Sequence, residues 1–321
     1  MVVKQTIIVS STGEGYYTTI GEAIKNAQPD SCILVRSGLY QEGLIIDKQL
    51  EIIGDGLVAD IVIESTDSSC IIMGTDYAVV RGLTLRGCRE VRYEFYAVDI
   101  PQGRLVLEDC DITSNSLSCI GIHGATANPL IRRCQIHDGK ADGVWVYENG
   151  QGTVEDCDIF ANTYSGVRIR KGSNPIIRRC QIHDNGSTGV LFSENGQGTV
   201  EDCDIFANAK VGVAIREGAN PIIRRCQIHD GKENGIIVSE NGQGTVEDCD
   251  IFANVKAGVA IKQGGNPIIR RCQINRNGYE AVWVYENGAG RVENCNLTGN
   301  TRGAWDIETG CSVYRSGNIE D

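Results

Sequence analysis

The sequence of 321 residues lacks a surplus of basic side chains: 30 lysines and arginines stand against 42 aspartates and glutamates, a formal net charge of −12. Nucleic-acid-binding proteins need clustered positive charge to neutralise phosphates, so we expect no nucleic-acid partner. No apolar run approaches the roughly 18 residues of a membrane-spanning helix. Residues 1–9 lack the apolar core and cleavage site of a signal peptide. We therefore expect a cytoplasmic protein that makes no membrane contact.

Cys-x-x-Cys pairs are also absent among the 14 cysteines, which removes a usual spacing of zinc sites. Ten of the cysteines instead recur at intervals of 22 to 24 residues. A free cysteine behaves in a protein as a small buried hydrophobe. We predict stacked core thiols, with no cofactor and no metal, at Cys88, Cys110, Cys134, Cys157, Cys180, Cys203, Cys226, Cys249, Cys272 and Cys295.

Two short sequence motifs alternate through most of the chain. The first, Asn-Pro-Ile-Ile-Arg-Arg-Cys-Gln-Ile-His-Asp, occupies 174–184 and 220–230 and, lightly changed, 128–138 and 266–276. The second, Gly-Thr-Val-Glu-Asp-Cys-Asp-Ile-Phe-Ala-Asn, occupies 152–162, 198–208 and 244–254 and, loosely, 290–300. Each motif recurs after 46 residues, and the two motifs are offset from one another by half of this period. A fixed period of this size is typical of a solenoid of stacked repeats.

Each 23-residue unit has room for three short strands. In residues 166–170 apolar and polar side chains alternate, which predicts a strand with Val167 and Ile169 facing inward. Two further strands are centred on Ile177 and on Ile182. Three strands and three turns close a triangular coil whose successive turns pair in parallel. We predict an all-β, single-stranded right-handed parallel β-helix of about 12 coils.

The chain outside the regular repeats is expected to complete the same solenoid domain. Residues 18–27 predict an amphipathic capping helix, with Thr19 at its start and Glu22 three residues later. The predicted order is an entry strand and capping helix in 1–31, irregular β-helix coils in 32–95, regular coils in 96–300 and a C-terminal cap in 301–321.

Residues 13–24 and 33–42 resemble the start of pectin-lyase-like β-helices, pectin methylesterases included. The two alternating motifs resemble the carbohydrate-binding and sugar-hydrolase (CASH) repeats. They are most similar to those in the β-helix of F-box proteins that select substrates for ubiquitin ligases. This resemblance covers nearly the whole chain and implies the β-helix fold. It leaves activity open, because the superfamily contains lyases, esterases, hydrolases, epimerases and proteins without enzymatic activity.

Charged and aromatic side chains also alternate from coil to coil. Arg178 and Arg179 stand one coil from Glu201 and Asp202. Facing like charges destabilise a sheet, so a two-coil repeat that places acids between bases has a structural purpose. Histidines alternate with phenylalanines in the same way, and we predict that these rings stack.

The outward positions of the first strand form two columns that combine aromatic, apolar and basic residues. The first column is Asp99, Gly121, Trp145, Arg168, Leu191, Ala214, Ile237, Ala260 and Trp283, and the second is Pro101, His123, Tyr147, Arg170, Ser193, Arg216, Ser239, Lys262 and Tyr285. Such a surface is typical of binding sites, although β-forming residues on a sheet face would give a similar pattern. We predict a rigid scaffold that binds a protein or glycan ligand here, with self-association through the same face as a further possibility. The predicted ligand-binding residues are Trp145, Tyr147, Arg168, Arg170, Leu191, Arg216, Ile237, Lys262, Trp283 and Tyr285.

The alternative is an enzyme acting on acidic polysaccharide, as a lyase, epimerase or hydrolase. A His or Asp beside an Arg suits proton abstraction, and a basic line suits uronate carboxylates. Against this alternative, coils of 22 to 24 residues offer no long loop to enclose a cleft. Hydrolysis also normally needs two carboxylates. The candidate catalytic residues are Asp99, His123, Arg168 and Arg170.

Three glutamates at one strand end break the alternation of charge. Glu194, Glu217 and Glu240 fall on successive coils. Carboxylates in this number suit a calcium ion, and they equally suit solvated turns. They are the weak calcium candidate of this sequence.

Overall fold

The computed structural model describes residues 5–88 and 95–321. Those parts of the predicted segments 1–31 and 32–95 that fall on residues 1–4 and 89–94 lie outside the described residues. The chain is an all-β, right-handed parallel solenoid of about 13 turns, against the 12 predicted, with three parallel sheets and almost no helix. It divides into two compact units. Unit 1 contains Met1–Trp145 and Gly150–Asp158, and unit 2 contains Val146–Asn149 and Ile159–Asp321.

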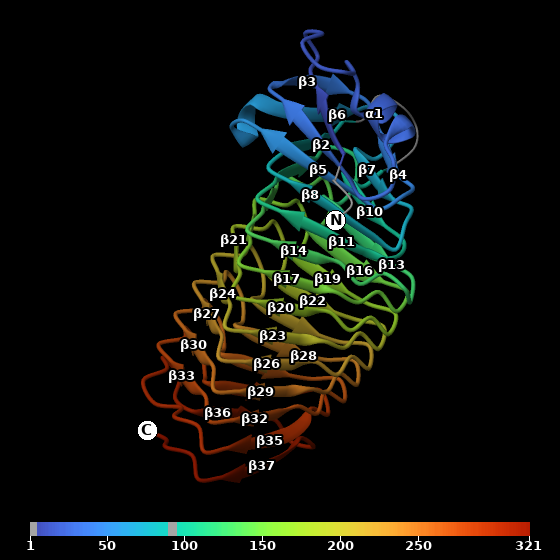
Figure 1. Cartoon of the computed structure of the whole chain (residues 1–321). Helices are drawn as coiled ribbons and strands as arrows, with labels where there is room; N and C mark the ends of the chain where they lie inside the picture. Colours follow the sequence, from blue (N-terminus) through green and yellow to red (C-terminus); the bar gives the residue numbers. More distant parts are fainter. Residues whose placement is uncertain (1–4, 89–94) are drawn as a thin grey trace. The chain divides into compact units, whose positions relative to one another are not determined.

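The three sheets of each unit, called A, B and C, follow one another along every coil (Figure 1). In unit 1, sheet A contains β1 (Thr6–Val9), β2 (Ser31–Arg36), β5 (Leu50–Asp55), β8 (Tyr77–Arg81), β11 (Arg104–Glu108), β14 (Leu130–Arg132) and β17 (Thr153–Glu155). Sheet B contains β3 (Gly38–Gln41), β6 (Ile61–Ser65), β9 (Thr84–Gly87), β12 (Asp111–Ser114) and β15 (Gln135–His137). Sheet C contains β4 (Leu44–Ile46), β7 (Ile71–Met73), β10 (Val98–Ile100) and β13 (Ile120–His123). Two strands have residues in both units, β16 (Val144–Tyr147) and β18 (Asp158–Phe160).

Unit 2 repeats the arrangement with shorter strands. Its sheet A contains β20 (Ile176–Arg178), β23 (Thr199–Glu201), β26 (Ile222–Arg224), β29 (Thr245–Glu247), β32 (Ile268–Arg270), β35 (Ala289–Glu293) and β37 (Ser312–Ser316). Sheet B contains β21 (Gln181–His183), β24 (Asp204–Phe206), β27 (Gln227–His229), β30 (Asp250–Phe252) and β33 (Gln273–Asn275). Sheet C contains β19 (Val167–Ile169), β22 (Val190–Phe192), β25 (Val213–Ile215), β28 (Ile236–Val238), β31 (Val259–Ile261), β34 (Val282–Val284) and β36 (Trp305–Ile307).

The inward side chains form the core in the predicted register. Val167 and Ile169 are fully buried, as are Ile177 and Ile182. Each pairs with the equivalent residue one coil later, so apolar side chains stack on like side chains along the axis, as for Val167 on Val190. The prediction of a coil with three inward-facing strands is confirmed.

The predicted capping helix is α1 (Ile20–Asn26). The Thr19 hydroxyl accepts a hydrogen bond from the backbone N–H of Glu22 at 3.3 Å. The Glu42 carboxylate accepts from the N–H groups of Ile20 and Gly21, both at 2.8 Å. Three otherwise unpaired N–H groups of the first turn are thereby satisfied. Within the described ranges no helix is long and apolar enough to span a membrane.

Residues 301–321, predicted as a cap, contain strands that continue the solenoid. Strand β36 pairs in parallel with β34, and β37 pairs in parallel with β35. Whether this segment closes the end of the solenoid stays a prediction.

Buried ladders hold successive coils of unit 2 together. All 14 cysteines, every one within the described chain, are free, and those from Cys110 to Cys295 are buried. A second ladder, which we did not predict, consists of asparagines. The Asn185 Oδ1 accepts from the backbone and side-chain amides of Asn162 at 3.1 and 3.0 Å. Buried amides at the same turn of successive coils thus satisfy one another, at Asn162, Asn185 and Asn208 and again at Asn254, Asn277 and Asn300. Gly231 interrupts the ladder between these two runs, and its backbone N–H donates to Asn254.

The predicted alternation of charges and rings is confirmed in unit 2. Arg224 lies 2.5 Å from Glu201, and the Arg271 guanidinium binds Asp248 at 2.7 Å. Hydrogen bonds from Arg225, Arg270 and Arg271 hold the pKa values of Asp202, Glu247 and Asp248, respectively, below their usual range. The His183 ring stacks on Phe206 with centroids 4.6 Å apart. The other stacked pairs are Phe160–His183, Phe206–His229 and His229–Phe252.

Candidate functional site

The outer face of sheet C in unit 2 carries the first predicted column of side chains in register. Arg168 pairs with Leu191, and Leu191 pairs with Ala214. The column continues through Ile237 and Ala260 to Trp283. Because each member is the middle residue of a three-residue strand, its neighbours on both sides point into the core.

The second column lies two residues further along each strand. The N–H of Ser193 donates to the Ile169 carbonyl at 3.0 Å, and the N–H of Arg216 donates to the Phe192 carbonyl at 3.0 Å. The same bond recurs at later coils, so the predicted order is confirmed within unit 2. The column contains Arg170, Ser193, Arg216, Ser239, Lys262 and Tyr285.

This face is more closely packed than an exposed apolar stripe. Leu191, Ile237 and Trp283 are only half-exposed, and Ala214 and Ala260 are buried. The apolar column is therefore not a continuous exposed surface. On the four coils from β22 to β31, one outward side chain is long and the other is short, as for Arg216 and Ala214. Neighbouring coils exchange these positions, so that side chains cover the gaps of the coil next to them.

The cations of the second column contact carboxylates of the adjoining turn. Arg170 lies 3.0 Å from the Glu194 carboxylate. The other two contacts are looser: Arg216 approaches Glu217 at 3.7 Å, and Lys262 approaches Glu286 at 3.9 Å. Within the described residues, the buried Nε of Arg216 and the buried hydroxyl of Ser193 have no hydrogen-bond partner. Two neighbouring coils therefore each hold a polar atom that the protein itself leaves unsatisfied.

The last aromatic pair of this face is preassembled. Trp283 and Tyr285 stack with centroids 4.0 Å apart and an interplanar angle of 17°. The Lys262 ammonium lies 5.5 Å from the centre of the Tyr285 ring, within the range of a cation–π contact. Burial, reinforced by the charge of Glu286, raises the pKa of Tyr285. The phenol is therefore a neutral group that can donate a hydrogen bond at the edge of an aromatic surface.

In unit 1, sheet C carries a histidine–carboxylate pair. The Nε2 of His123 lies 2.9 Å from an Asp99 carboxylate oxygen, and about a quarter of each side chain is exposed. The ring of Tyr96 packs directly over Gly121, where a Cβ atom would come within 2.6 Å of it. Tyr96 in turn meets Trp145 edge to face, with centroids 6.2 Å apart. The pair thus lies on the same sheet face as two aromatic rings.

Of the predicted catalytic residues, Asp99 and His123 contact one another in unit 1. Arg168 and Arg170 belong to unit 2, and their catalytic role stays a prediction. An aspartate bound to one imidazole nitrogen orients the ring, and an oriented histidine can accept or donate a proton.

The three glutamates proposed for calcium do not form a site. Among the described residues, no group of three or more histidine, cysteine, aspartate or glutamate side chains is placed to hold a metal ion. Glu194 binds Arg170 and Glu217 faces Arg216. Glu194 thus has a cationic neighbour from the preceding coil, and Glu217 has one from its own coil.

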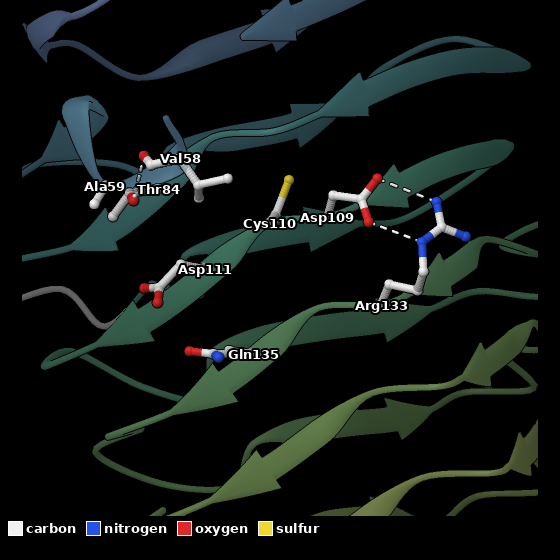
Figure 2. Close-up of a pocket in the computed structure, with 8 residues that line it drawn as sticks. All are labelled: Val58, Ala59, Thr84, Asp109, Cys110, Asp111, Arg133 and Gln135. Atoms are coloured by element: carbon white, nitrogen blue, oxygen red, sulfur yellow. Dashed lines mark hydrogen bonds and ion pairs between the residues drawn. The ribbon is translucent and has the colours of Figure 1, made fainter. Parts of the chain in front are cut away.

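A hollow of about 330 Å³ in unit 1 was not predicted (Figure 2). One wall is the 3₁₀ turn η1 (Val58–Asp60), and Thr84 donates from its hydroxyl to the Val58 carbonyl at 2.9 Å. Opposite, the Asp109 carboxylate binds the Arg133 guanidinium at 2.8 and 3.1 Å. Its charged pair is already neutralised, so the hollow offers a ligand less than the face of sheet C does.

Sequence reasoning missed three features of these sites. Tyr96 precedes the regular repeats, and only the glycine at an outward strand position, Gly121, signals that something packs against that strand. Ser193 was placed in the correct column but was not chosen as a binding residue. The irregular stretch 54–60 could have indicated the hollow, because an insertion between strands forms its wall.

Comparison with known proteins identifies the fold family of the solenoid. A family model described as "Right handed beta helix region" matches residues 69–220 and 193–319. Among solved structures, the A-module of the Azotobacter vinelandii mannuronan C-5 epimerase AlgE6 aligns with a TM-score of 0.78 and 17% identity, over 93% of this chain and 92% of that one. The periplasmic alginate epimerase AlgG aligns at 0.66 and 14%, over 90% and 76%. The catalytic domain of a GH87 alpha-1,3-glucanase in complex with nigerose aligns at 0.65 and 13%, over 98% and 65%. These structures share the pectin-lyase-like fold with this chain. The chain belongs to the right-handed β-helix family.

Proposed function

We propose that this protein is a polysaccharide-active β-helix protein that binds an acidic polysaccharide along the outer face of sheet C. The observation that carries the proposal is the column of cations, Arg170, Arg216 and Lys262, beside a half-buried apolar column in unit 2. A column of cations on one sheet face is unexpected in a protein whose net charge is −12. The similar structures named for epimerases of mannuronan and alginate support an acidic glycan.

The chemistry of the face suits uronate sugars. A guanidinium fork binds a carboxylate through two parallel hydrogen bonds, and this pairing is stronger than one between neutral groups. Leu191, Ile237 and Trp283 offer apolar surface to the C–H faces of pyranose rings.

A chemical step on the bound glycan is the second part of the proposal. The supporting observation is the 2.9 Å contact between His123 and Asp99 beside the Tyr96 and Trp145 rings. Removal of the proton next to a uronate carboxylate starts both epimerisation and β-elimination, and an oriented histidine is a suitable base. We propose His123 as this base and Asp99 as the residue that positions it.

A protein ligand on the same face is the competing proposal. The resemblance to CASH repeats and to the β-helix of F-box substrate receptors would imply such a partner. Side chains that bind sugar rings also suit protein interfaces, because both use aromatic residues and arginine. Charge separates the two: an acidic glycan needs Arg216 and Lys262, whereas an apolar protein interface depends mainly on Trp283 and Ile237.

The test is calorimetric titration of the whole chain with polymannuronate, polyguluronate, polygalacturonate and a neutral glucan. We expect binding to the uronates alone, and a loss of about tenfold in affinity for Arg216→Gln, the size expected for a charge-assisted contact. Lys232→Gln, an exposed cation of a turn, is the matched control. Equal binding of the neutral glucan, or no binding of any uronate, would contradict the proposal.

Turnover is measured separately, on the polymer that binds. Epimerisation appears as a change in the uronate signals of a proton NMR spectrum, and elimination appears as ultraviolet-absorbing ends. We expect His123→Gln to abolish either signal while binding on unit 2 persists. Binding without turnover in the wild-type protein would reject the catalytic part and leave the binding part intact.

A further inference from the structure

The 46-residue repeat gives four successive strands of sheet C in unit 2, from β22 to β31, two alternating kinds of outward side chain. Strands β22 and β28 each carry a bulky aliphatic residue followed by serine, Leu191 with Ser193 and Ile237 with Ser239. Strands β25 and β31 each carry alanine followed by a long cation, Ala214 with Arg216 and Ala260 with Lys262. Cations and aliphatic side chains therefore recur with the same two-coil period, one coil out of step with each other.

The period sets a length. Neighbouring parallel strands lie about 4.8 Å apart, so equivalent side chains two coils apart are separated by about 9.6 Å. Arg216 and Lys262 are related in this way, as are Leu191 and Ile237. The face thus repeats a positive charge and an apolar patch at every second coil, and short side chains lie between them.

An extended glycan chain has a matching repeat. One pyranose of such a chain advances by close to one strand spacing. In a twofold ribbon, successive sugars turn their substituents to opposite edges, so one edge presents a single carboxylate for every two sugars. If the face had one cation in every coil, only half of the cations would meet a carboxylate on that edge of the chain. With one cation in every second coil, every cation meets a carboxylate.

When an acidic ligand binds, the cations of the face would exchange carboxylates of the protein for carboxylates of the ligand. The carboxylates that would compete with a ligand are Glu194, Glu217, Glu240 and Glu286, in the turns that follow these strands. Ion pairs at exposed positions contribute about 0–1 kcal/mol, so a ligand carboxylate can displace the loose contact of Glu217 with Arg216 at little cost.

Building on the proposed function, we propose that unit 2 binds an acidic glycan parallel to the solenoid axis and reads it in steps of two sugars. One carboxylate per disaccharide meets the cations in turn, Arg170, Arg216 and Lys262, and one apolar sugar face per disaccharide covers Leu191 or Ile237. The binding face thereby selects polymers with an acid on one edge at every second residue.

The test is calorimetric titration with size-fractionated oligomannuronates of two to eight sugars. We expect affinity to rise in steps, with a gain of about fivefold or more at every second added sugar, because each gain brings one more charge-assisted contact. Lys262→Gln should remove one step and leave the shorter oligomers unaffected. Glu217→Gln should raise affinity, because it removes the carboxylate that competes for Arg216. Lys232→Gln should leave the staircase unchanged.

The outcomes separate the two proposals. A smooth rise with every added sugar, or a staircase that Lys262→Gln leaves intact, would overturn the two-sugar register while the binding of acidic glycans stands. No binding of any oligouronate or polyuronate would overturn both. A variant that unfolds at the same temperature as the wild-type protein has kept its fold, so a lost step in that variant reflects a lost contact.

Discussion

Units 1 and 2 wind the same three sheets, but they differ in regularity. From β19 to β34 every strand of unit 2 has three residues, whereas the described strands of unit 1 vary from three to six and are interrupted by α1 and η1. Equal coils place equal side chains above one another, and this gives unit 2 its ladders and its flat face. Unequal coils place different side chains together, and this gives unit 1 a hollow and a histidine–aspartate pair. Regularity thus favours extended binding surfaces, and irregularity favours local clusters.

The treatment of buried carboxylates shows the same difference. Glu108 of unit 1 is 3% exposed and is held by Arg81, Arg132 and Arg133. Glu201 of unit 2 is more exposed and binds two arginines of the next coil, Arg224 and Arg225. A buried charge requires several partners, so the irregular unit concentrates its arginines on one carboxylate. The regular unit distributes them along a ladder.

The largest effect on the regular unit is expected from its largest buried side chain. Phe192 is fully buried where the adjacent coils have Ile169 and Ile215. Phe192→Ala should destabilise unit 2 by about 3–5 kcal/mol, because the removed ring leaves a cavity. Phe206→Ala, on the half-exposed stack with His183, is the control and should cost about 1 kcal/mol. Hydrogen exchange of the β22 and β25 amides measures both, and equal losses would contradict the distinction.

Breaking the asparagine ladder should have the next largest effect. Asn185→Ala removes the acceptor for two amides of Asn162 and the donor to the Ile159 carbonyl. Buried groups left without partners should cost about 2–3 kcal/mol. The exposed Asn174 of the same coil provides the control Asn174→Ala, for which we expect less than about 0.5 kcal/mol. The urea midpoint of unit 2 is the measurement, and a neutral Asn185→Ala would show that the ladder contributes no stability.

The charge ladder of unit 2 should make that unit sensitive to acid. Hydrogen bonds from Arg225, Arg270 and Arg271 lower the pKa values of Asp202, Glu247 and Asp248, respectively. Stability from a lowered pKa is present above the unfolded value, near 4, and is lost as the pH falls through the folded value. Melting temperatures measured between about pH 2 and 6 should fall on the acid side, and less steeply in Asp248→Asn. High salt should reduce the slope, because these groups are exposed.

In unit 1 the pH dependence of one group should have the opposite sign. The pKa of His137 is raised by its contact with Asp111 at 3.4 Å and by Asp138 at 2.7 Å, against the effect of burial. Its stabilisation is fully present below the ordinary value of 6.5 and is lost as the pH rises through the folded pKa. Proton NMR titration of the imidazole measures the pKa directly. A value at or below 6.5, or one unchanged by Asp111→Asn, would contradict the assignment.

The smallest difference between the units is expected in thiol reactivity. Burial raises the pKa of Cys70 in unit 1 to about 12, and the neighbouring thiol of Cys226 does most to raise the pKa of Cys249 in unit 2 to about 12. The thiolate is the reactive form, so iodoacetamide should not label either residue in the folded protein near neutral pH. Cys311, which is partly exposed, is the internal control and should be labelled first. Peptide mass spectrometry after brief labelling gives the order.

Much of this structure is readable from the sequence because a repeat makes its own register explicit. The cysteine interval fixed which residues stack, and the alternation in residues 166–170 fixed which face inward. Arg224 over Glu201 and His183 beside Phe206 followed from the same two-coil period. Exposure did not follow from it, because the burial of Ala260 depends on the long side chains of the coils on either side. The packing of Tyr96 over Gly121 also lies outside any period.

The sequence by itself determined the coil, its three sheets and the order of the side-chain columns, because parallel stacking converts a 23-residue spacing directly into neighbours in space. Only the tertiary structure decided which polar groups are buried without partners, how Asp99 meets His123, and where Val58 and Arg133 enclose a hollow. Each of these depends on the volumes and conformations of side chains from different coils, and such contacts are a property of three-dimensional packing rather than of spacing along the chain.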